Sequence, residues 1–174
     1  MTTEARATLS VTISSIRDPS SPTRLGRILS DLTATVVHDP DVVWRLQMAV
    51  HEIAENLAKY ADGDFVSIEV AVEDIGESEI RCTVSSRNAA SPERLAEAGR
   101  ALAAIANAQN PGAYYRRLMT ESAFKPGSGL GFARIRAEGG FALEFEIEGT
   151  QLRLKAIGQW GSGRKWVGGE SLPP

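Results

Sequence analysis

The first third of the chain predicts one strand followed by two helices. Residues 7–14, ATLSVTIS, alternate apolar and polar side chains, which is the pattern of a half-buried strand. Helical spacing follows at Leu25, Ile28, Leu29, Leu32 and Val36. A second apolar stripe runs along residues 41–61, at Val43, Leu46, Ala49, Val50, Ile53 and Leu57. This longer stripe is typical of a helix that lies against a sheet.

The rest of the chain predicts two hairpins with helices between them. Alternating segments flank a turn in two places, at residues 64–74 with 79–86 and at residues 141–148 with 151–157. Helices are predicted over residues 92–108, from Ala113, and from about Leu130 to the Gly139–Gly140 pair. The last four predicted strands therefore form two hairpins. Helices are predicted before the first hairpin and between the two.

This order predicts an α/β (α+β) two-layer sandwich, in which helices cover a mostly antiparallel mixed sheet. A single domain is expected over residues 1–157. Residues 158–174 are rich in Gly, Ser and Pro. We expect this C-terminal tail to be poorly ordered, or to order on a partner through Trp160 and Trp166.

Composition narrows the classes of protein to which the chain belongs. Its 174 residues suit one domain, and its 19 Lys and Arg against 22 Asp and Glu argue against a nucleic-acid binder. No apolar run approaches the roughly 20 residues of a membrane span, and no secretion signal is recognisable, so the cytoplasm is the expected compartment. With one Cys and two His, neither an internal disulfide nor a zinc site is expected. Cys82 is predicted to be a buried, inert thiol.

The first candidate site is the stretch HEIAENLAKY, residues 51–60, on the longer helix. Glu52 and Asn56 are four residues apart and project from the same helix face, with Lys59 beside them. An amide oxygen can ligate Mg²⁺, a carboxylate can accept a proton, and a lysine can neutralise phosphate. The alternative is an exposed polar edge, on which Glu55 and Lys59 form an ordinary ion pair between successive turns.

The second candidate site is the stretch GSGLG just before a predicted helix. It comprises Gly127, Ser128, Gly129, Leu130 and Gly131. Free backbone N–H groups and a helix N-terminus together form an anion site that suits phosphate. The alternatives are a flexible turn or a dinucleotide fingerprint. The fingerprint requires a strand immediately before the glycines, whereas the preceding residues look helical and then loop-like.

In this order, the two stretches resemble the GHKL superfamily of histidine-kinase-like (Bergerat-fold) ATPases. Within it, the chain looks most similar to the small stand-alone serine/threonine kinases of partner-switching systems, the anti-sigma factor and SiaB-like kinases. The resemblance spans about residues 7–157. It implies that ATP and Mg²⁺ bind, with Asn56 as the magnesium ligand, Glu52 as the general base and Lys59 on phosphate. The glycine stretch would wrap the triphosphate, and residues 89–126 would form a lid.

The sequence departs from the family at the position that reads adenine. Most members carry a D-x-G-x-G box after the strand, whose aspartate accepts a hydrogen bond from the adenine amino group. Here CTVSS runs into RNAAS, with neither aspartate nor glycine. Asn88 or Ser86 would then meet adenine, since an amide oxygen or a hydroxyl also accepts this bond. The alternative is that nucleotide binding is weak or lost.

The resemblance implies a kinase that uses Mg-ATP to phosphorylate a serine or threonine of a small antagonist protein, STAS-like or similar. A sigma factor is a further expected partner, and homodimerisation is expected from the family. The rival function is a catalytically degenerate module that binds a sigma factor or an antagonist without kinase activity. A DNA-repair or chaperone-type ATPase needs transducer domains, for which a chain of 174 residues has no room.

Overall fold

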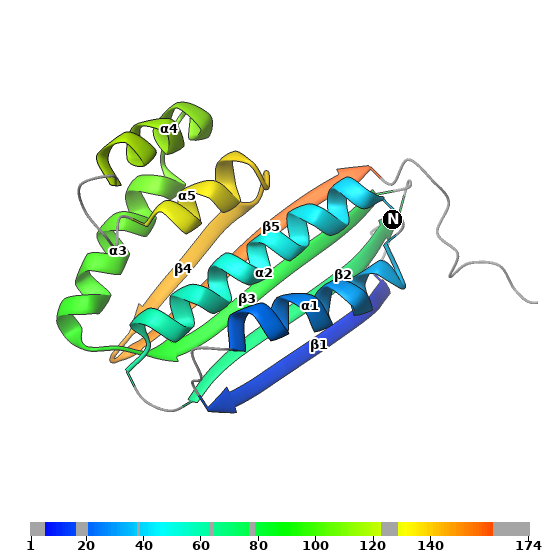
Figure 1. The fold of residues 1–174 in the computed structure, drawn as a ribbon, viewed down its shortest axis with the longest axis horizontal. Helices are drawn as coiled ribbons and strands as arrows, with labels where there is room; N and C mark the ends of the chain where they lie inside the picture. Colours follow the sequence, from blue (N-terminus) through cyan, green and yellow to red (C-terminus); the bar gives the residue numbers. More distant parts are fainter. Residues whose placement is uncertain are drawn as a thin grey trace, which may run out of the picture.

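The computed structural model has two layers, with a five-stranded sheet covered on one face by helices (Figure 1). It describes residues 6–16, 21–37, 39–62, 65–76, 79–122 and 129–161. The strands are β1 (Arg6–Ile16), β2 (Phe65–Gly76), β3 (Glu79–Ala89), β4 (Ala142–Glu148) and β5 (Gln151–Gly161). The helices are α1 (Ser21–Ala34), α2 (Pro40–Tyr60), α3 (Pro92–Ala106), α4 (Pro111–Ser122) and α5 (Leu130–Ala137).

The strands lie in the order β1-β2-β3-β5-β4, and each neighbouring pair is antiparallel. The two-layer sandwich predicted from the sequence is therefore confirmed, with no parallel pair among the described strands. Both hairpins are present, and β3 and β5 join them into one sheet. None of the described helices combines the length and the apolar character that crossing a membrane requires.

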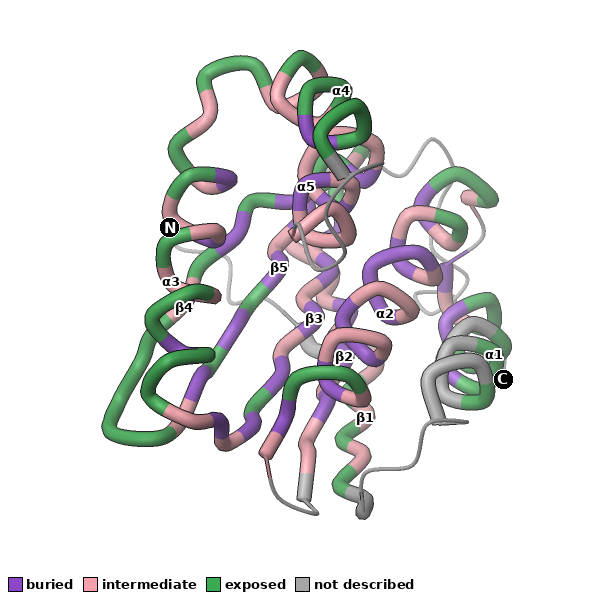
Figure 2. Tube along the Cα trace, turned by 60° about the vertical axis from the view of Figure 1, so that its left-hand side comes forward, coloured by how far each residue is buried: buried purple, intermediate pink, exposed green. Residues whose placement is uncertain are grey.

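The hydrophobic core lies between the sheet and α2, the central helix of the covering layer (Figure 2). On β3 the side chains that face the helices are Ile80, Cys82 and Val84, all fully buried. The same face continues at Ser86 and Asn88, where the strand becomes polar while remaining buried. An apolar floor thus ends in a polar patch near one end of the sheet.

The helix ends are fixed by side chains from neighbouring positions. The Asp39 carboxylate accepts a hydrogen bond from the Asp41 N–H at 2.9 Å, so that α2 begins at Pro40. The Asn110 side chain likewise accepts from the Ala113 N–H at 2.9 Å. Because of this bond and Pro111, α4 begins at Pro111 rather than at the predicted Ala113.

Strand β5 continues beyond the domain boundary drawn at residue 157. Residues 158–161 pair with β3 as far as the Glu79–Gly161 register. Trp160 packs edge to face against Phe141, with 5.0 Å between the ring centroids. Its indole lies directly over Gly158, where no side chain would fit. Residues 158–161 therefore belong to the sheet and not to a tail, whereas Trp166 lies outside the described residues.

Cys82 should be unreactive in the native protein. Its side chain is fully buried, and burial raises the pKa of the thiol to about 12. We expect a disulfide reagent at about pH 8 to label Cys82 only after unfolding in concentrated guanidinium. An unfolded thiol ionises near pH 8.5. Above that pH the unfolded state gains stability by ionising the thiol, whereas the folded state keeps it neutral. The contribution of the buried thiol to the free energy of unfolding is therefore complete below about pH 8.5 and declines as the pH rises. Rapid labelling of the native protein would contradict this placement.

Candidate functional site

A pocket of about 420 Å³ opens between the helical layer and the polar end of β3. Ser86 and Asn88 of β3 form its floor together with Leu152 and Leu154 of β5. One wall is α2, with Ile53, Asn56, Leu57 and Tyr60, and the other is α3, with Arg94, Glu97, Ala98 and Ala101. Gly129 and Phe132 at the start of α5 complete the lining. A volume of this size suits a small organic ligand.

The floor of the pocket holds two buried polar side chains whose hydrogen bonding to the described residues is incomplete. Ser86 and Asn88 are each 8% exposed. The Asn88 Nδ2 donates to the Ala89 carbonyl at 3.2 Å, but no donor in the described part of the chain reaches Asn88 Oδ1. The Ser86 hydroxyl likewise has no hydrogen bond to the described residues. Because buried polar groups are normally satisfied, both atoms fit a ligand that offers a donor here.

The two stretches singled out in the sequence meet where α2 contacts the first turn of α5. A Cβ atom at Gly131 would lie 2.5 Å from Glu52 Oε2 and 3.5 Å from Asn56 Nδ2. Only glycine therefore allows this close approach. Asn56 lines the pocket, and its amide makes no hydrogen bond within the described ranges. Glu52 lies one helical turn away and is not part of the lining.

Gly129, Leu130 and Gly131 form the start of α5. Gly129 precedes the helix in a left-handed conformation, with φ of +67°, and lines the pocket. That conformation favours glycine. Gly127 and Ser128 lie outside the described residues. The described part of the glycine stretch thus places a helix N-terminus, and its partial positive charge, beside the pocket.

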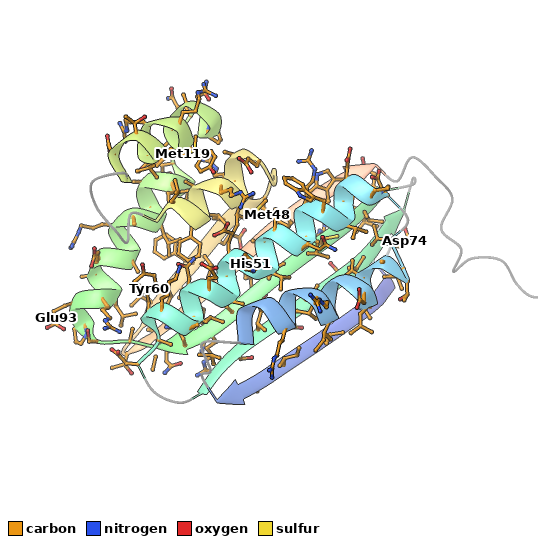
Figure 3. All side chains as sticks on the ribbon, in the orientation of Figure 1. Met48, His51, Tyr60, Asp74, Glu93 and Met119 are labelled. Atoms are coloured by element: carbon orange, nitrogen blue, oxygen red, sulfur yellow. The ribbon has the colours of Figure 1, made fainter. Side chains whose placement is uncertain are left out.

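Lys59 lies on the outward face of α2 rather than at the pocket. Its Nζ bonds Glu55 Oε2 at 2.7 Å, and its side chain is 59% exposed. Glu55 Oε1 also lies 3.2 Å from His51 Nε2, so that His51, Glu55 and Lys59 form a row along the helix. Figure 3 labels His51 on this helix. The hydrogen bond raises the pKa of Lys59 and lowers that of Glu55. This Glu55–Lys59 ion pair is the one expected if residues 51–60 were simply an exposed polar edge of the helix.

Residues that the sequence did not single out also shape the site. The α3 wall depends on Arg94, whose Nη1 donates to Asp62 Oδ1 at 2.8 Å and to the Tyr60 carbonyl at 3.3 Å. These bonds fasten the start of α3 to the end of α2, beside Tyr60 (Figure 3). Small residues at 98 and 101, on one face of α3, were the available signal for a wall that leaves room for a ligand.

Arg134 is the other residue that sequence reasoning missed. Its Nη1 donates to Glu52 Oε1 at 3.0 Å, and its Nε donates to Glu138 Oε2 at 2.8 Å. The spacing of Arg134, one turn after Gly131, was the only hint in the sequence that it faces α2.

The described residues contain no cluster of three or more His, Cys, Asp or Glu side chains that could hold a metal. A magnesium ion on Asn56 would therefore take its other oxygen ligands from phosphates and water. In nucleotide sites Mg²⁺ usually keeps several waters and binds substrate phosphates together with one or two protein groups, most often carboxylates. The amide oxygen of Asn56 is a suitable ligand for a magnesium ion that phosphates and water also coordinate.

Comparison with known proteins gives a likeness of fold. No family model matches the chain, and no curated protein matches its sequence. A chain in the crystal structure of the SiaB–SiaC complex from Pseudomonas aeruginosa has a similar fold, with a TM-score of 0.63. The alignment covers 89% of this chain and 91% of that chain, at 16% sequence identity. The chain therefore shares its fold with a component of that two-protein complex.

Proposed function

We propose that the chain binds Mg-ATP in the pocket beside Asn56 and acts as a partner-switching regulator of the GHKL type. In this role it phosphorylates a serine or threonine of a small antagonist protein. One observation carries the proposal: the polar floor at Ser86 and Asn88, the Asn56 side chain and the start of α5 all border one pocket of about 420 Å³. Apolar side chains that cover a base, polar side chains that orient it and a helix N-terminus for phosphate are the parts that a purine nucleotide needs.

The adenine base would lie on the β3 floor. Asn88 Oδ1 would accept from the adenine amino group, with the Ser86 hydroxyl as a second polar contact. Leu57, Leu152 and Phe132 line the pocket around this floor and would cover the faces of the base. Asn88 thus replaces the aspartate of the D-x-G-x-G box.

The phosphates would lie toward α5. Asn56 would hold Mg²⁺, and the N–H groups at Gly129, Leu130 and Gly131 would bind phosphate oxygens, together with Gly127 and Ser128. Lys59 could join them only after leaving Glu55. Helix α3 lies in the segment predicted as the lid, and it already forms one wall of the pocket.

For phosphotransfer, Mg-ATP supplies the phosphoryl group and the chain orients the reactants. Glu52 would accept the proton of the attacking hydroxyl, and the start of α5 would stabilise negative charge on the phosphate. The similar fold belongs to a complex of two proteins. We therefore propose a small protein as the partner, with a STAS-like antagonist favoured, a sigma factor as a further partner, and a cytoplasmic homodimer as the working form.

A second candidate function is a module that binds a partner protein, and can bind nucleotide, without transferring phosphate. The position of Glu52 favours it, because the carboxylate pairs with Arg134 and does not line the pocket. Labelled ATP separates the two functions once a partner protein is in hand. A kinase transfers phosphate and loses transfer in Glu52→Gln, whereas a binding module transfers none in either form.

Replacing Asn88 with leucine tests the base-binding end of the pocket. We expect ATP to bind at least about tenfold more weakly, a loss of about 1.4 kcal/mol, because the acceptor for the amino group is gone. The free energy of unfolding should stay the same or rise by up to about 1 kcal/mol, since an unsatisfied buried carbonyl is removed. Calorimetric titration and chemical denaturation measure the two effects.

Arg87→Leu is the matched control for this variant. Arg87 is the neighbouring residue on β3, is exposed, and bonds Gln151 on the other face of the sheet. It should bind ATP as the wild type does. The wild type should also prefer ATP to GTP, because guanine presents a carbonyl where adenine presents an amino group. Unchanged ATP affinity in Asn88→Leu would exclude this position for the base.

A further inference from the structure

Arg134 forms the centre of an ion network between α2 and α5. It bonds the Glu52 carboxylate at 3.0 Å and the Glu138 carboxylate at 2.8 Å. Arg45 of α2 donates to the carbonyls of Glu138 and Gly139 at 3.0 and 3.1 Å. The C-terminal end of α5 is thereby fastened to α2, and Arg134 is held in position over Glu52.

The Glu52 carboxylate is placed where negative charge is unfavourable for the proposed ligand. It touches the first turn of α5 at Gly131, and Asn56 lies on the next turn of the same helix. A triphosphate held by Asn56 and the start of α5 would lie close to this carboxylate. Like charges at short range repel strongly in a partly buried site, and the side chain of Glu52 is only 16% exposed.

We propose that Arg134 is a positioning residue that neutralises Glu52 and fixes its carboxylate, so that a nucleotide polyphosphate can bind beside it. The inference rests on the proposed function and adds a residue that the glycine stretch and the HEIAENLAKY stretch do not contain. Arg134 acts through Glu52 and requires no contact with the ligand. Its two bonds to carboxylates leave the guanidinium plane in a defined orientation.

The ionisation of Arg134 is consistent with this role. Hydrogen bonding to Glu138 raises the pKa of the guanidinium most, and hydrogen bonding to Glu52 raises it further, against the opposing effect of burial. Arg134 therefore carries its charge throughout the range in which proteins are studied. A purely structural ion pair between Arg134 and Glu52 would affect the binding of charged and neutral ligands equally.

A double-mutant cycle tests the proposal with ATP and adenosine as probes. Arg134→Ala should weaken ATP binding at least about tenfold, whereas adenosine, which lacks phosphates, should bind as it does to the wild type. In a Glu52→Gln background, the same substitution should change ATP affinity less than about threefold, because no carboxylate is left to neutralise. Arg134→Lys should recover part of the loss, since it keeps the charge without the planar geometry.

Arg81→Ala is the matched control. Arg81 is 37% exposed at its side chain and pairs with Glu73 at 3.7 Å, and Arg134 is 38% exposed and also pairs with glutamate. Arg81 lies on the face of β3 away from the helices, because its neighbour Cys82 faces the core. This variant should bind both probes like the wild type.

Each outcome of the cycle has a defined meaning. An equal loss of ATP affinity with and without Glu52, or a matching loss of adenosine affinity, would overturn the neutralising role. If the wild type binds ATP and both Arg134 variants bind it equally well, this inference fails and the proposed function stands. If the wild type binds neither probe, both fail. Should Arg134→Ala unfold, Arg134→Lys in the two Glu52 backgrounds still decides the question.

Discussion

Asn56→Ala is expected to abolish the magnesium-dependent part of ATP binding, with a loss of about 100-fold or more in affinity. The amide is the only magnesium ligand proposed on α2, it lines the pocket, and it has no hydrogen bond in the described part of the chain. Mutating a residue that only supports a metal ligand typically lowers metal affinity by about 10-fold to 100-fold, and removing the ligand itself should cost at least as much. Because ATP is expected to bind together with Mg²⁺, the loss of magnesium binding and the loss of ATP affinity should appear together. Calorimetric titration with Mg²⁺ and with a chelator measures them.

The fold should not suffer from this substitution. Asn56 is half-buried, and alanine favours a helix over asparagine by several tenths of a kcal/mol, so we expect an unchanged or slightly raised free energy of unfolding. His51→Ala, on the outward row of the same helix, is the control and should bind normally. If Asn56→Ala kept both the affinity and the magnesium dependence of the wild type, Asn56 could not be the metal ligand.

Gly131→Ala is expected to cause an equally large loss of ATP affinity, about 100-fold, through crowding rather than loss of a ligand. The added Cβ would lie 2.5 Å from Glu52 Oε2, so the carboxylate must shift from the position in which Arg134 holds it. At 3.5 Å from Asn56 Nδ2, the added Cβ would make an ordinary van der Waals contact with the proposed magnesium ligand. The displaced atoms are the ends of flexible side chains. Alanine also stabilises a helix by about 1 kcal/mol relative to glycine, so the net change in stability should be small.

Gly112→Ala provides a closely matched control for this prediction. Gly112 is the second residue of α4, as Gly131 is the second residue of α5. A Cβ at Gly112 would make only ordinary contacts, at 3.5 Å to Arg116 Nη1 and 3.7 Å to Asn110 Oδ1. The variant should bind ATP normally and unfold at the same or a higher temperature. Comparable ATP binding by Gly131→Ala would show that the contact of α5 with Glu52 is irrelevant to the ligand.

The fold could be predicted from the sequence because apolar residues recur at regular strand or helix spacing in most of its elements. Alternation at Ile80, Cys82 and Val84 specifies which face of β3 is buried, and the stripe on α2 specifies the face that covers it. The end of β5 could not be predicted, because Gly158 and Gly161 resemble a loop in isolation. Pairing with β3 and the packing of Trp160 on Phe141 override that local preference.

The candidate site could be predicted only in part. Helical spacing correctly placed Glu52 and Asn56 on one face, and the glycines at 129 and 131 mark where another element approaches closely. Which charged group pairs with which depends on tertiary structure. Lys59 forms an ion pair with Glu55 on its own helix, whereas Glu52 forms one with Arg134 of α5. The resemblance placed α3 within a lid over residues 89–126, but it did not indicate which residues of α3 line the pocket.

The most direct test of nucleotide binding is a calorimetric titration of the wild-type protein with ATP and a non-hydrolysable analogue, with and without Mg²⁺. We predict binding in the micromolar range that depends on Mg²⁺ and is shared by the analogue, because recognition by Asn88, Asn56 and the start of α5 precedes any transfer of phosphate. No heat and no thermal stabilisation at millimolar nucleotide would contradict the nucleotide site. The binding of a partner protein without nucleotide would then be the remaining proposed function.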